Sequence, residues 1–258
     1  MKKLVTAACA LAAGLAMAEG VTSANTVGFI DITTVANTMD TAGVPFTGVA
    51  ASGDISIQDI KLVGTVSYGE DWIKFWNPAT KKYTFAYYWD ELYADVEDDD
   101  PIPGAVGWGD GDQTLITMTL PAGRGFWAQT ANSVKVSIPG EVVSVADNKI
   151  RTVANTMDLF ANVYPVRTDI QDITLKGSVT YGEDWIKFWN PATKKYEFAY
   201  YWNELYADVE DDDPIPGKVG WGDGDQTLIT KTLDIGEGFW SQTANAVDIE
   251  FKVPAGLE

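Results

Sequence analysis

Carboxylates crowd into one acidic stretch that occurs twice in the chain, at residues 95–112 and 208–225. Hard oxygen ligands at this density are the ligands that Ca²⁺ prefers, and the neighbouring glycines would let the backbone curl around an ion. The stretch therefore predicts a calcium site in each copy, while a solvated, self-repelling loop is the simpler alternative. The ligands expected for calcium are Asp98, Asp99, Asp100, Asp110 and Asp112, with Asp211, Asp212, Asp213, Asp223 and Asp225 in the second copy.

The acidic stretch matches known calcium loops only in part. It lacks the alternating acids, the central glycine and the closing glutamate of an EF-hand loop. Residues 109–115 resemble one turn of a calcium-binding β-roll, but such a roll needs consecutive turns. Calcium is therefore expected as an optional ligand, and no cofactor is predicted to be required.

Paired carboxylates could also serve as the acid and the nucleophile of a glycosidase. Glu70 or Asp71 could pair with Asp95 or Glu97, yet no spacing selects one pair over another. The chain contains no histidine, which excludes Ser/His/Asp triads and imidazole-ligated zinc. We therefore predict no catalytic residue and expect a protein that is not an enzyme.

Charge and cysteine content restrict the partners. The formal net charge is −19, a value that repels nucleic acid and anionic membranes and favours cations. Cys9 is the single cysteine, so no intramolecular disulfide can form and the core alone must stabilise the fold.

A long internal repeat sets the organisation of the chain. Residues 68–120 and 181–233 align 113 positions apart, and their four differences are Thr84/Glu197, Asp90/Asn203, Ala105/Lys218 and Met118/Lys231. All 10 tryptophans fall into five pairs at the same offset, so each copy carries a full aromatic set. Repetition of this kind suits a binding or structural protein better than a catalyst with one assembled site.

Short β-branched and aromatic runs alternate with Gly, Pro, Asn and Asp, which is typical of an all-β sandwich. Strands are expected at residues 27–35, 55–63, 72–76, 83–89, 114–120, 125–130 and 134–138. The predicted fold is all-β, with two tandem, duplicated antiparallel β-sandwich modules at residues 19–140 and 141–258. The short segment between them predicts a semi-rigid pair.

The clearest hairpin joins residues 72–76 to 83–89 through an Asn-Pro turn. Pairing Trp76 with Tyr83 sets Trp72 opposite Tyr87 and aligns six aromatic side chains on one face. This aromatic row is either a platform for sugar rings or part of the core. Because the copies differ at positions of the opposite parity, Thr84/Glu197 and Asp90/Asn203, we expect the other face to be wet and the row to point inward.

Two of the tryptophans outside the row each lie between glycines. Trp108 and its copy Trp221 are therefore predicted to be exposed contacts that could stack on a ligand.

Residues 1–18 have the features of a secretory signal peptide: two lysines, an apolar run and an Ala-Met-Ala cleavage site. Lipidation at Cys9 is an alternative, although the apolar run before it is short. No later run reaches the about 20 apolar residues of a membrane helix, so no transmembrane segment is predicted. We expect an exported protein at the cell surface or outside the cell.

Three short motifs carry a resemblance to a group of bacterial proteins: ANTVGF at residues 24–29, VAN at 35–37, and PAGRGFW at 121–127, where the second copy has IGEGFW at 235–240. Together they resemble uncharacterised exported tandem β-rich modules of verrucomicrobial-type bacteria. The resemblance implies secretion and a β-rich module, and it brings no catalytic residue with it.

The sequence favours a non-enzymatic, structural or adhesive protein of the cell envelope or extracellular matrix. Its partners would be further copies of itself or an envelope or matrix polymer. The alternative is a carbohydrate-binding protein, assisted by calcium, that holds a polysaccharide on Trp108 and Trp221.

Overall fold

The computed structural model describes residues 27–48, 53–95, 97, 100–208, 210 and 213–257. Within these ranges the chain folds into antiparallel sheets joined by turns and three short 3₁₀ segments, with no α-helix. The all-β prediction is confirmed. No helix in this part of the chain has the length and apolar character needed to span a membrane.

Three sheets form the first half of the chain. A five-stranded sheet has the order β2-β9-β5-β6-β7, a three-stranded sheet has the order β1-β10-β4, and β3 pairs with β8. The strands are β1 (Val27–Thr33), β2 (Asp40–Gly43), β3 (Ile55–Ser56), β4 (Lys61–Val63), β5 (Trp72–Asn77), β6 (Lys82–Trp89), β7 (Gly107–Gly109), β8 (Thr119–Leu120), β9 (Gly125–Gln129) and β10 (Lys135–Glu141), with a 3₁₀ turn η1 at Ile57–Asp59.

The second half repeats this arrangement. Its sheets have the orders β12-β19-β15-β16-β17, β11-β20-β14 and β13-β18. The elements are η2 (Val145–Asp147), β11 (Lys149–Arg151), β12 (Asp158–Ala161), β13 (Thr168–Asp169), η3 (Ile170–Asp172), β14 (Ile173–Gly177), β15 (Trp185–Asn190), β16 (Lys195–Trp202), β17 (Gly220–Gly222), β18 (Thr232–Leu233), β19 (Gly238–Gln242) and β20 (Val247–Phe251).

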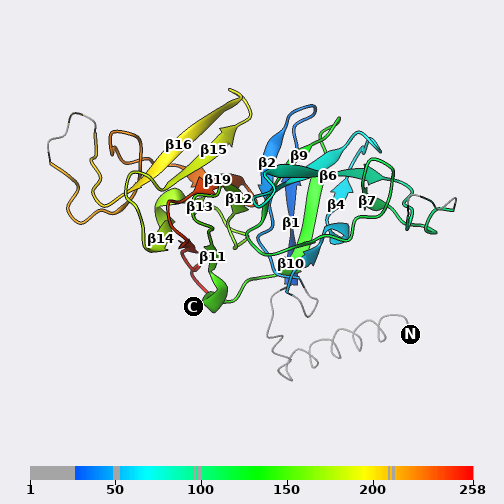
Figure 1. Ribbon diagram of the computed structural model, residues 1–258, viewed down its shortest axis with the longest axis horizontal. Coiled ribbons are helices and arrows are strands. Elements are labelled where there is room, and N and C mark those ends of the chain that lie inside the picture. Colours follow the sequence, from blue (N-terminus) through cyan, green and yellow to red (C-terminus); the bar gives the residue numbers. More distant parts are fainter. Residues whose placement is uncertain are drawn as a thin grey trace, which may run out of the picture.

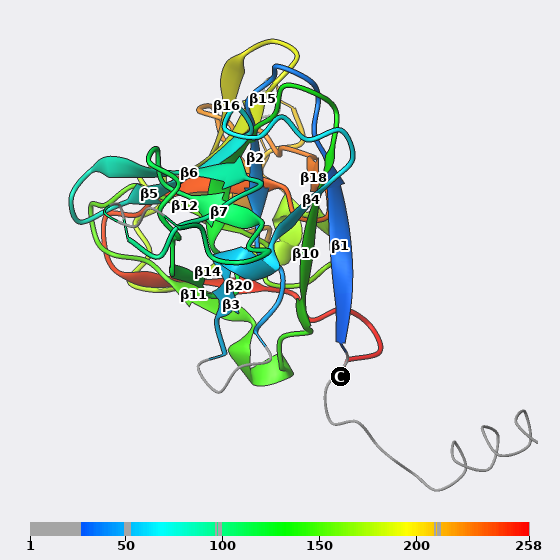
Figure 2. The ribbon, with the colours of Figure 1, turned by 90° about the vertical axis from the view of Figure 1, so that its right-hand side faces the viewer.

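In each half, a core lies between the five-stranded and the three-stranded sheet. Their strands cross at a steep angle, and Figure 2 shows β1 and β10 upright while β6 runs across them. In the first half, Ile73, Phe75 and Tyr88 come from one sheet and Ile30 and Val136 from the other. Each strand contributes alternate residues to this core, as the period of two requires.

Strand predictions succeeded where β-branched and aromatic residues were dense. The prediction for residues 55–63 gave one strand, but the 3₁₀ turn at Ile57–Asp59 divides it into β3 and β4. In that turn, Ser56 Oγ accepts a hydrogen bond from the Gln58 backbone N–H, which ends the strand. Of residues 114–120, only Thr119–Leu120 is a strand, and β2 and β7 were not predicted.

The two halves lie side by side, with β2 and β9 of one next to β12 and β19 of the other (Figure 1). Gly43 ends β2 and faces Ala161, the residue that ends β12 at the equivalent position. A residue that meets its own counterpart lies on a two-fold axis of an isologous contact. The halves are therefore related by an internal pseudo-two-fold axis between Gly43 and Ala161.

The backbones at this axis leave no room for another methyl group, because a Cβ on Gly43 would overlap the Cβ of Ala161. We therefore expect Gly43→Ala to lower the stability by about 1–3 kcal/mol, as overpacking does, measured by thermal melting. Gly28→Ala is the matched control, since a Cβ there meets nothing within 4 Å. Equal melting temperatures for the two variants would contradict the close approach of β2 and β12.

Candidate functional site

The aromatic row lies on the β5–β6 hairpin with the expected register. Trp76 pairs with Tyr83, Lys74 with Phe85, and Trp72 with Tyr87, and the second half repeats these pairs. The prediction that the row fills the sandwich core is wrong. Ile73, Phe75, Ala86 and Tyr88 on the opposite face are the buried residues of this hairpin.

The position of the differing residues explains this error. Thr84 is exposed near the turn end of β6 although its partner Phe75 is buried, and Asp90 follows the end of β6. Their counterparts Glu197 and Asn203 are equally peripheral, and Asn190 donates a hydrogen bond to Glu197 at 2.9 Å. A strand face is dry only where another layer covers it, so the strand ends tell nothing about its middle.

One part of the row is buried between the halves of the chain. Trp127, Leu159 and Trp240 form a third core, against which Trp72, Trp76, Trp185 and Trp189 pack. The rings of Trp76 and Trp240 meet edge to face at 5.8 Å, and those of Trp127 and Trp189 at 5.6 Å. The sheet faces that carry the aromatic rows of the two halves therefore cover each other here.

Hydrogen bonds across this third core repeat in both directions. The Trp76 indole Nε1–H donates to the Met157 carbonyl at 2.7 Å, and the Trp189 Nε1–H donates to the Met39 carbonyl at 2.9 Å. Buried indole N–H groups that find partners make the contact specific as well as apolar.

The other part of the row reaches solvent. Tyr83 is 37% exposed and Phe85 40%, and in the second half Tyr196 is 36% and Phe198 44% exposed. The rings of Phe85 and Tyr87 are nearly parallel, at 15° and 6.2 Å between centroids, and Phe198 and Tyr200 repeat this geometry. We call Tyr83, Phe85 and Tyr87 with Tyr196, Phe198 and Tyr200 the aromatic surface.

In each half, a lysine lies beneath the rings of the aromatic surface. Lys74 Nζ is 4.5 Å from the Tyr83 ring centroid and 5.2 Å from that of Trp72, while Phe85 and Trp127 are at 5.7 Å. Lys187 has the equivalent four rings. Burial lowers the pKa of both ammonium groups, and cation–π contacts stabilise the charge that burial disfavours.

Trp108 and Trp221 are not exposed contacts, and this prediction is wrong. Both side chains are 0% exposed, and their Nε1–H groups donate to the Ile60 and Ile173 carbonyls at 2.8 and 2.7 Å. The flanking glycines serve close packing, because a Cβ at Gly107 would collide with Gln58 and one at Gly109 with Leu92. Neither tryptophan can stack on a ligand in this structure.

Near the end of each acidic stretch, a carboxylate holds a turn. Asp110 Oδ1 accepts hydrogen bonds from the Asp112 and Thr114 backbone N–H groups at 2.9 and 3.0 Å, and Asp223 repeats this with Asp225 and Thr227. Asp100, Asp112, Asp213 and Asp225 are exposed. Among the described residues, no three acidic side chains are placed to share a metal ion.

Four of the expected ligands, Asp98, Asp99, Asp211 and Asp212, lie outside the described residues. Calcium binding therefore stays a prediction. If these loops bind Ca²⁺, millimolar calcium raises the melting temperature above that in chelator, because a ligand of the folded state stabilises it by mass action. A melting curve that calcium leaves unchanged, with magnesium as the control ion, would contradict the prediction.

Asp71, considered above as half of a carboxylate pair, has a structural role. Its side chain is buried, and its two oxygens accept hydrogen bonds from the Ser67 and Ala131 backbone N–H groups at 2.8 and 2.7 Å. Asp184 binds Thr180 and Ala244 in the same way. These carboxylates tie the loop before the hairpin to the end of β9 or β19 rather than facing a ligand.

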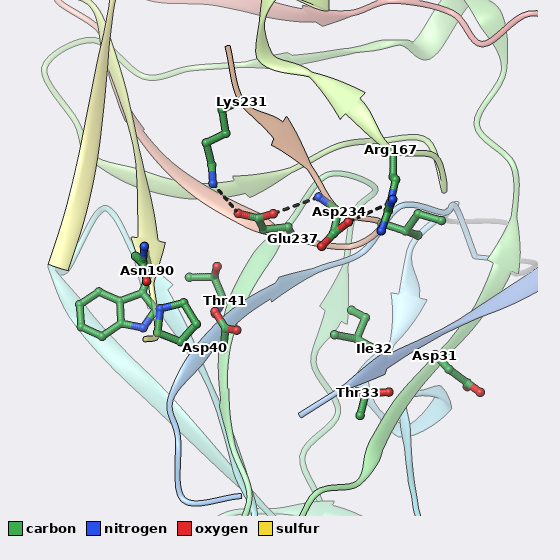
Figure 3. Close-up of a pocket in the computed structure, with 13 residues that line it drawn as sticks. Asp31, Ile32, Thr33, Asp40, Thr41, Arg167, Asn190, Lys231, Asp234 and Glu237 are labelled. Carbon is green, nitrogen blue, oxygen red and sulfur yellow. Dashed lines mark hydrogen bonds and ion pairs between the residues drawn. The ribbon is translucent and has the colours of Figure 1, made fainter. Parts of the chain in front are cut away.

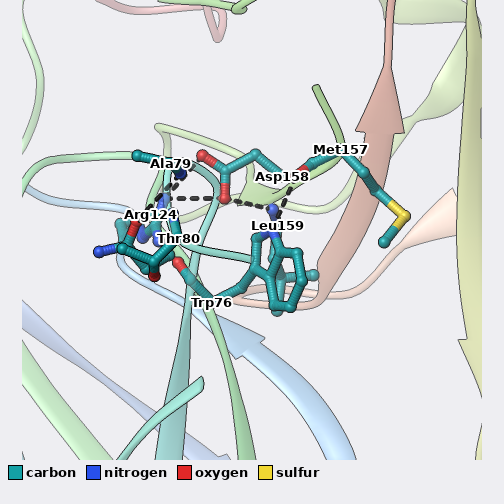
Figure 4. Close-up of polar contacts among 8 residues, drawn as sticks. Trp76, Ala79, Thr80, Arg124, Met157, Asp158 and Leu159 are labelled. Atoms are coloured by element: carbon teal, nitrogen blue, oxygen red, sulfur yellow. Dashed lines mark hydrogen bonds and ion pairs between the residues drawn. The ribbon is translucent and has the colours of Figure 1, made fainter. Parts of the chain in front are cut away.

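The contact between the halves has two ends, and an arginine bridges the halves at the first end (Figure 4). Arg124 Nη1 donates to both carboxylate oxygens of Asp158, at 2.9 and 2.8 Å, while Nη2 donates to the Trp76 carbonyl. Burial raises the pKa of Asp158, and the Arg124 guanidinium opposes this rise. The guanidinium thus links the hairpin of the first half to β12 of the second.

The second end is a cleft of about 540 Å³ (Figure 3). The counterparts of Arg124 and Asp158 are Glu237 and Asp40, so two acids replace the ion pair, and both line the cleft. Lys231 Nζ lies 3.5 Å from Glu237, and Arg167 Nε lies 2.9 Å from Asp234. Burial raises the pKa of Asp40, the Thr41 backbone N–H lowers it, the Glu237 charge raises it, and the Lys231 charge lowers it.

The sequence suggested the aromatic row as a sugar platform but favoured the core, and it did not predict the cleft. A signal for the cleft was nevertheless present, because Met118 and Arg124 become Lys231 and Glu237 in otherwise similar copies. Two charge changes six positions apart indicate a local difference in electrostatics.

A scan against protein-family models and searches of curated proteins and of solved structures find no match to the chain.

The two ends of the interface predict opposite effects of the same substitution. Asp158→Asn leaves the Arg124 charge without its partner and should lower stability by about 1–3 kcal/mol. Asp40→Asn removes a desolvated carboxylate that faces Glu237 and should leave the melting temperature unchanged or raise it. Both variants keep an oxygen that can accept the hydrogen bond from the next backbone N–H.

The effect of Asp40 depends on pH in a defined direction. Its pKa in the folded protein is above the ordinary value of 3.8. The Asp40 carboxyl group therefore lowers the stability of the fold as pH rises from 3.8 through the folded-state pKa, and it has no such effect below 3.8, where the group is protonated in both states. Any gain from Asp40→Asn in thermal melting should therefore be larger at pH 7 than at pH 3. A loss of stability at pH 7 equal to that of Asp158→Asn would contradict the assignment of the two ends.

Proposed function

We propose that this chain is a non-enzymatic, exported adhesive protein that binds a polysaccharide of the cell envelope or extracellular matrix through its aromatic surface. The observation that carries the proposal is the exposure of Tyr83, Phe85, Tyr196 and Phe198. Sugar rings present apolar C–H faces that pack on aromatic rings, and a binding surface commonly exposes apolar side chains in a group. The proposal needs no catalytic residue.

Neighbouring contacts hold the aromatic surface in position. Tyr83 packs edge to face on Trp76 at 5.1 Å, and Phe85 packs on Trp72 at 5.5 Å. Both tryptophans belong to the third core, so the exposed rings rest on a buried base. A ligand that stacks there does not first have to order these side chains, which favours binding.

Polar groups beside the rings can give the surface its selectivity. Lys74 and Lys187 are half-buried under the rings, and their N–H groups could bond to hydroxyl or carboxylate oxygens of a sugar. Each half contributes three rings to the aromatic surface, so one polymer can bind to both sets. Binding to the first set raises the effective concentration of the polymer at the second.

Self-assembly is a second candidate, which one observation favours. Phe29 is 69% exposed on β1, an edge strand of the three-stranded sheet. An exposed apolar residue on a free strand edge can pair with another copy of the chain. Assembly through β1 would make the protein structural as well as adhesive.

Retention on insoluble polysaccharides tests the proposal. We expect wild-type protein to be retained on at least one member of a broad panel. Phe85→Ala with Phe198→Ala should weaken retention about tenfold or more, since stacked rings contribute of the order of 1 kcal/mol each. The matched control Phe29→Ala removes an exposed phenylalanine from outside the aromatic surface and should leave retention unchanged.

Two outcomes would count against polysaccharide binding. One is a wild-type protein that no polysaccharide retains, and the other is equal retention of wild type and the double variant. Light scattering of the Phe29→Ala variant tests self-assembly separately from polysaccharide binding. Loss of large species in this variant, but not in the double variant, would indicate assembly through β1.

A further inference from the structure

The strongest unexplained feature of the molecule is the cleft at the Glu237 end of the contact between the halves. Its floor and walls come from both halves, with Asp40 and Thr41 from β2 and Trp189, Lys231 and Glu237 from the second half. Figure 3 shows Lys231, Glu237 and Asp234 in a chain of contacts above Asp40.

The other end of the same contact shows what this arrangement of groups can hold. There the guanidinium of Arg124 lies between the Asp158 carboxylate and the Trp76 carbonyl. The counterparts of these acceptors, Asp40 and Trp189, both line the cleft. The cleft thus repeats the carboxylate and the carbonyl-bearing residue of a guanidinium site, but Glu237 stands where the arginine would be.

Three acids that line the cleft have an ion-pair partner, while Asp40 is influenced by the Lys231 charge without pairing with it. Lys231 pairs with Glu237, Arg167 with Asp234, and Lys135 with Asp31. For Asp40, no ion pair occurs within the described part of the chain, and its Oδ1 accepts only the Thr41 backbone N–H. A half-buried carboxylate without a cation is costly, so a bound cation would be stabilised there.

The shape of the site favours a planar organic cation over a metal ion. No three acidic side chains are placed to share a metal among the described residues, whereas about 540 Å³ of open volume accommodates a side chain or a small molecule. A guanidinium can donate to a carboxylate and a carbonyl at once, which an ammonium does with less fixed geometry.

We propose that the cleft binds the guanidinium group of a ligand, with Asp40 as the anionic partner and Glu237 and Trp189 beside it. The ligand supplies the cation that Arg124 supplies at the other end. Its guanidinium belongs either to a free small molecule or to an arginine of a peptide. This site is separate from the aromatic surface and does not depend on polysaccharide binding.

Titration with methylguanidinium at low millimolar concentration tests the site, and the NMR signal of the Trp189 indole N–H reports binding. We expect saturable shifts, and weaker binding of methylammonium. Asp40→Asn should reduce the affinity about tenfold, as loss of one charge-assisted pair does. Asp59→Asn removes the same charge from an exposed turn and is the control.

The most direct variant is Glu237→Arg, which restores the arginine found at the other end. It should place a guanidinium against Asp40, abolish methylguanidinium binding, and raise the melting temperature. Agmatine and a short peptide with one arginine then distinguish a small-molecule ligand from a peptide ligand, because the probe that resembles the true ligand should bind more tightly. A wild-type protein without saturable shifts, or a folded Glu237→Arg variant that binds as wild type does, would overturn the proposal.

Discussion

The tryptophan core between the two halves is the contact on which the rest of this structure depends. Trp127 and Trp240 lie at its centre, and Trp76 and Trp189 bond from each half to the backbone of the other. A half of about 113 residues without disulfides has a modest core of its own. Burial of large aromatic side chains between the halves adds apolar area, so that the pair should be more stable than either half alone.

This contact also decides what the aromatic row can do. The sheet faces that carry the two aromatic rows cover each other only in part. Trp72 and Trp76 therefore lie in the covered part and support the rings of Tyr83 and Phe85, which remain at the surface. The same two-fold relation creates two chemically different ends. Arg124 bridges the halves at one end, and Glu237 lines a cleft at the other, so a repeat that is almost symmetric has two ends of different charge.

The sequence predicted the all-β class and the register of the β5–β6 hairpin, because both follow from local patterns. Alternation and the Asn-Pro turn depend only on residues close in the chain. The face of the aromatic row was mispredicted because a sheet face is covered or bare according to which distant element packs on it, and residues at strand ends such as Thr84 do not report this. Trp108 was mispredicted because glycines can serve close packing as well as exposure. Contacts across the halves have no local signal, apart from the paired changes to Lys231 and Glu237.

NMR of the selectively labelled tryptophans tests whether the two halves share one tryptophan core. The ring geometry predicts strong nuclear Overhauser effects between Trp76 and Trp240 and between Trp127 and Trp189, whose centroids are 5.8 and 5.6 Å apart. The Trp76 and Trp189 indole N–H signals should also exchange slowly with solvent. Cross-peaks confined to tryptophans of the same half, with fast exchange of both indoles, would contradict the account.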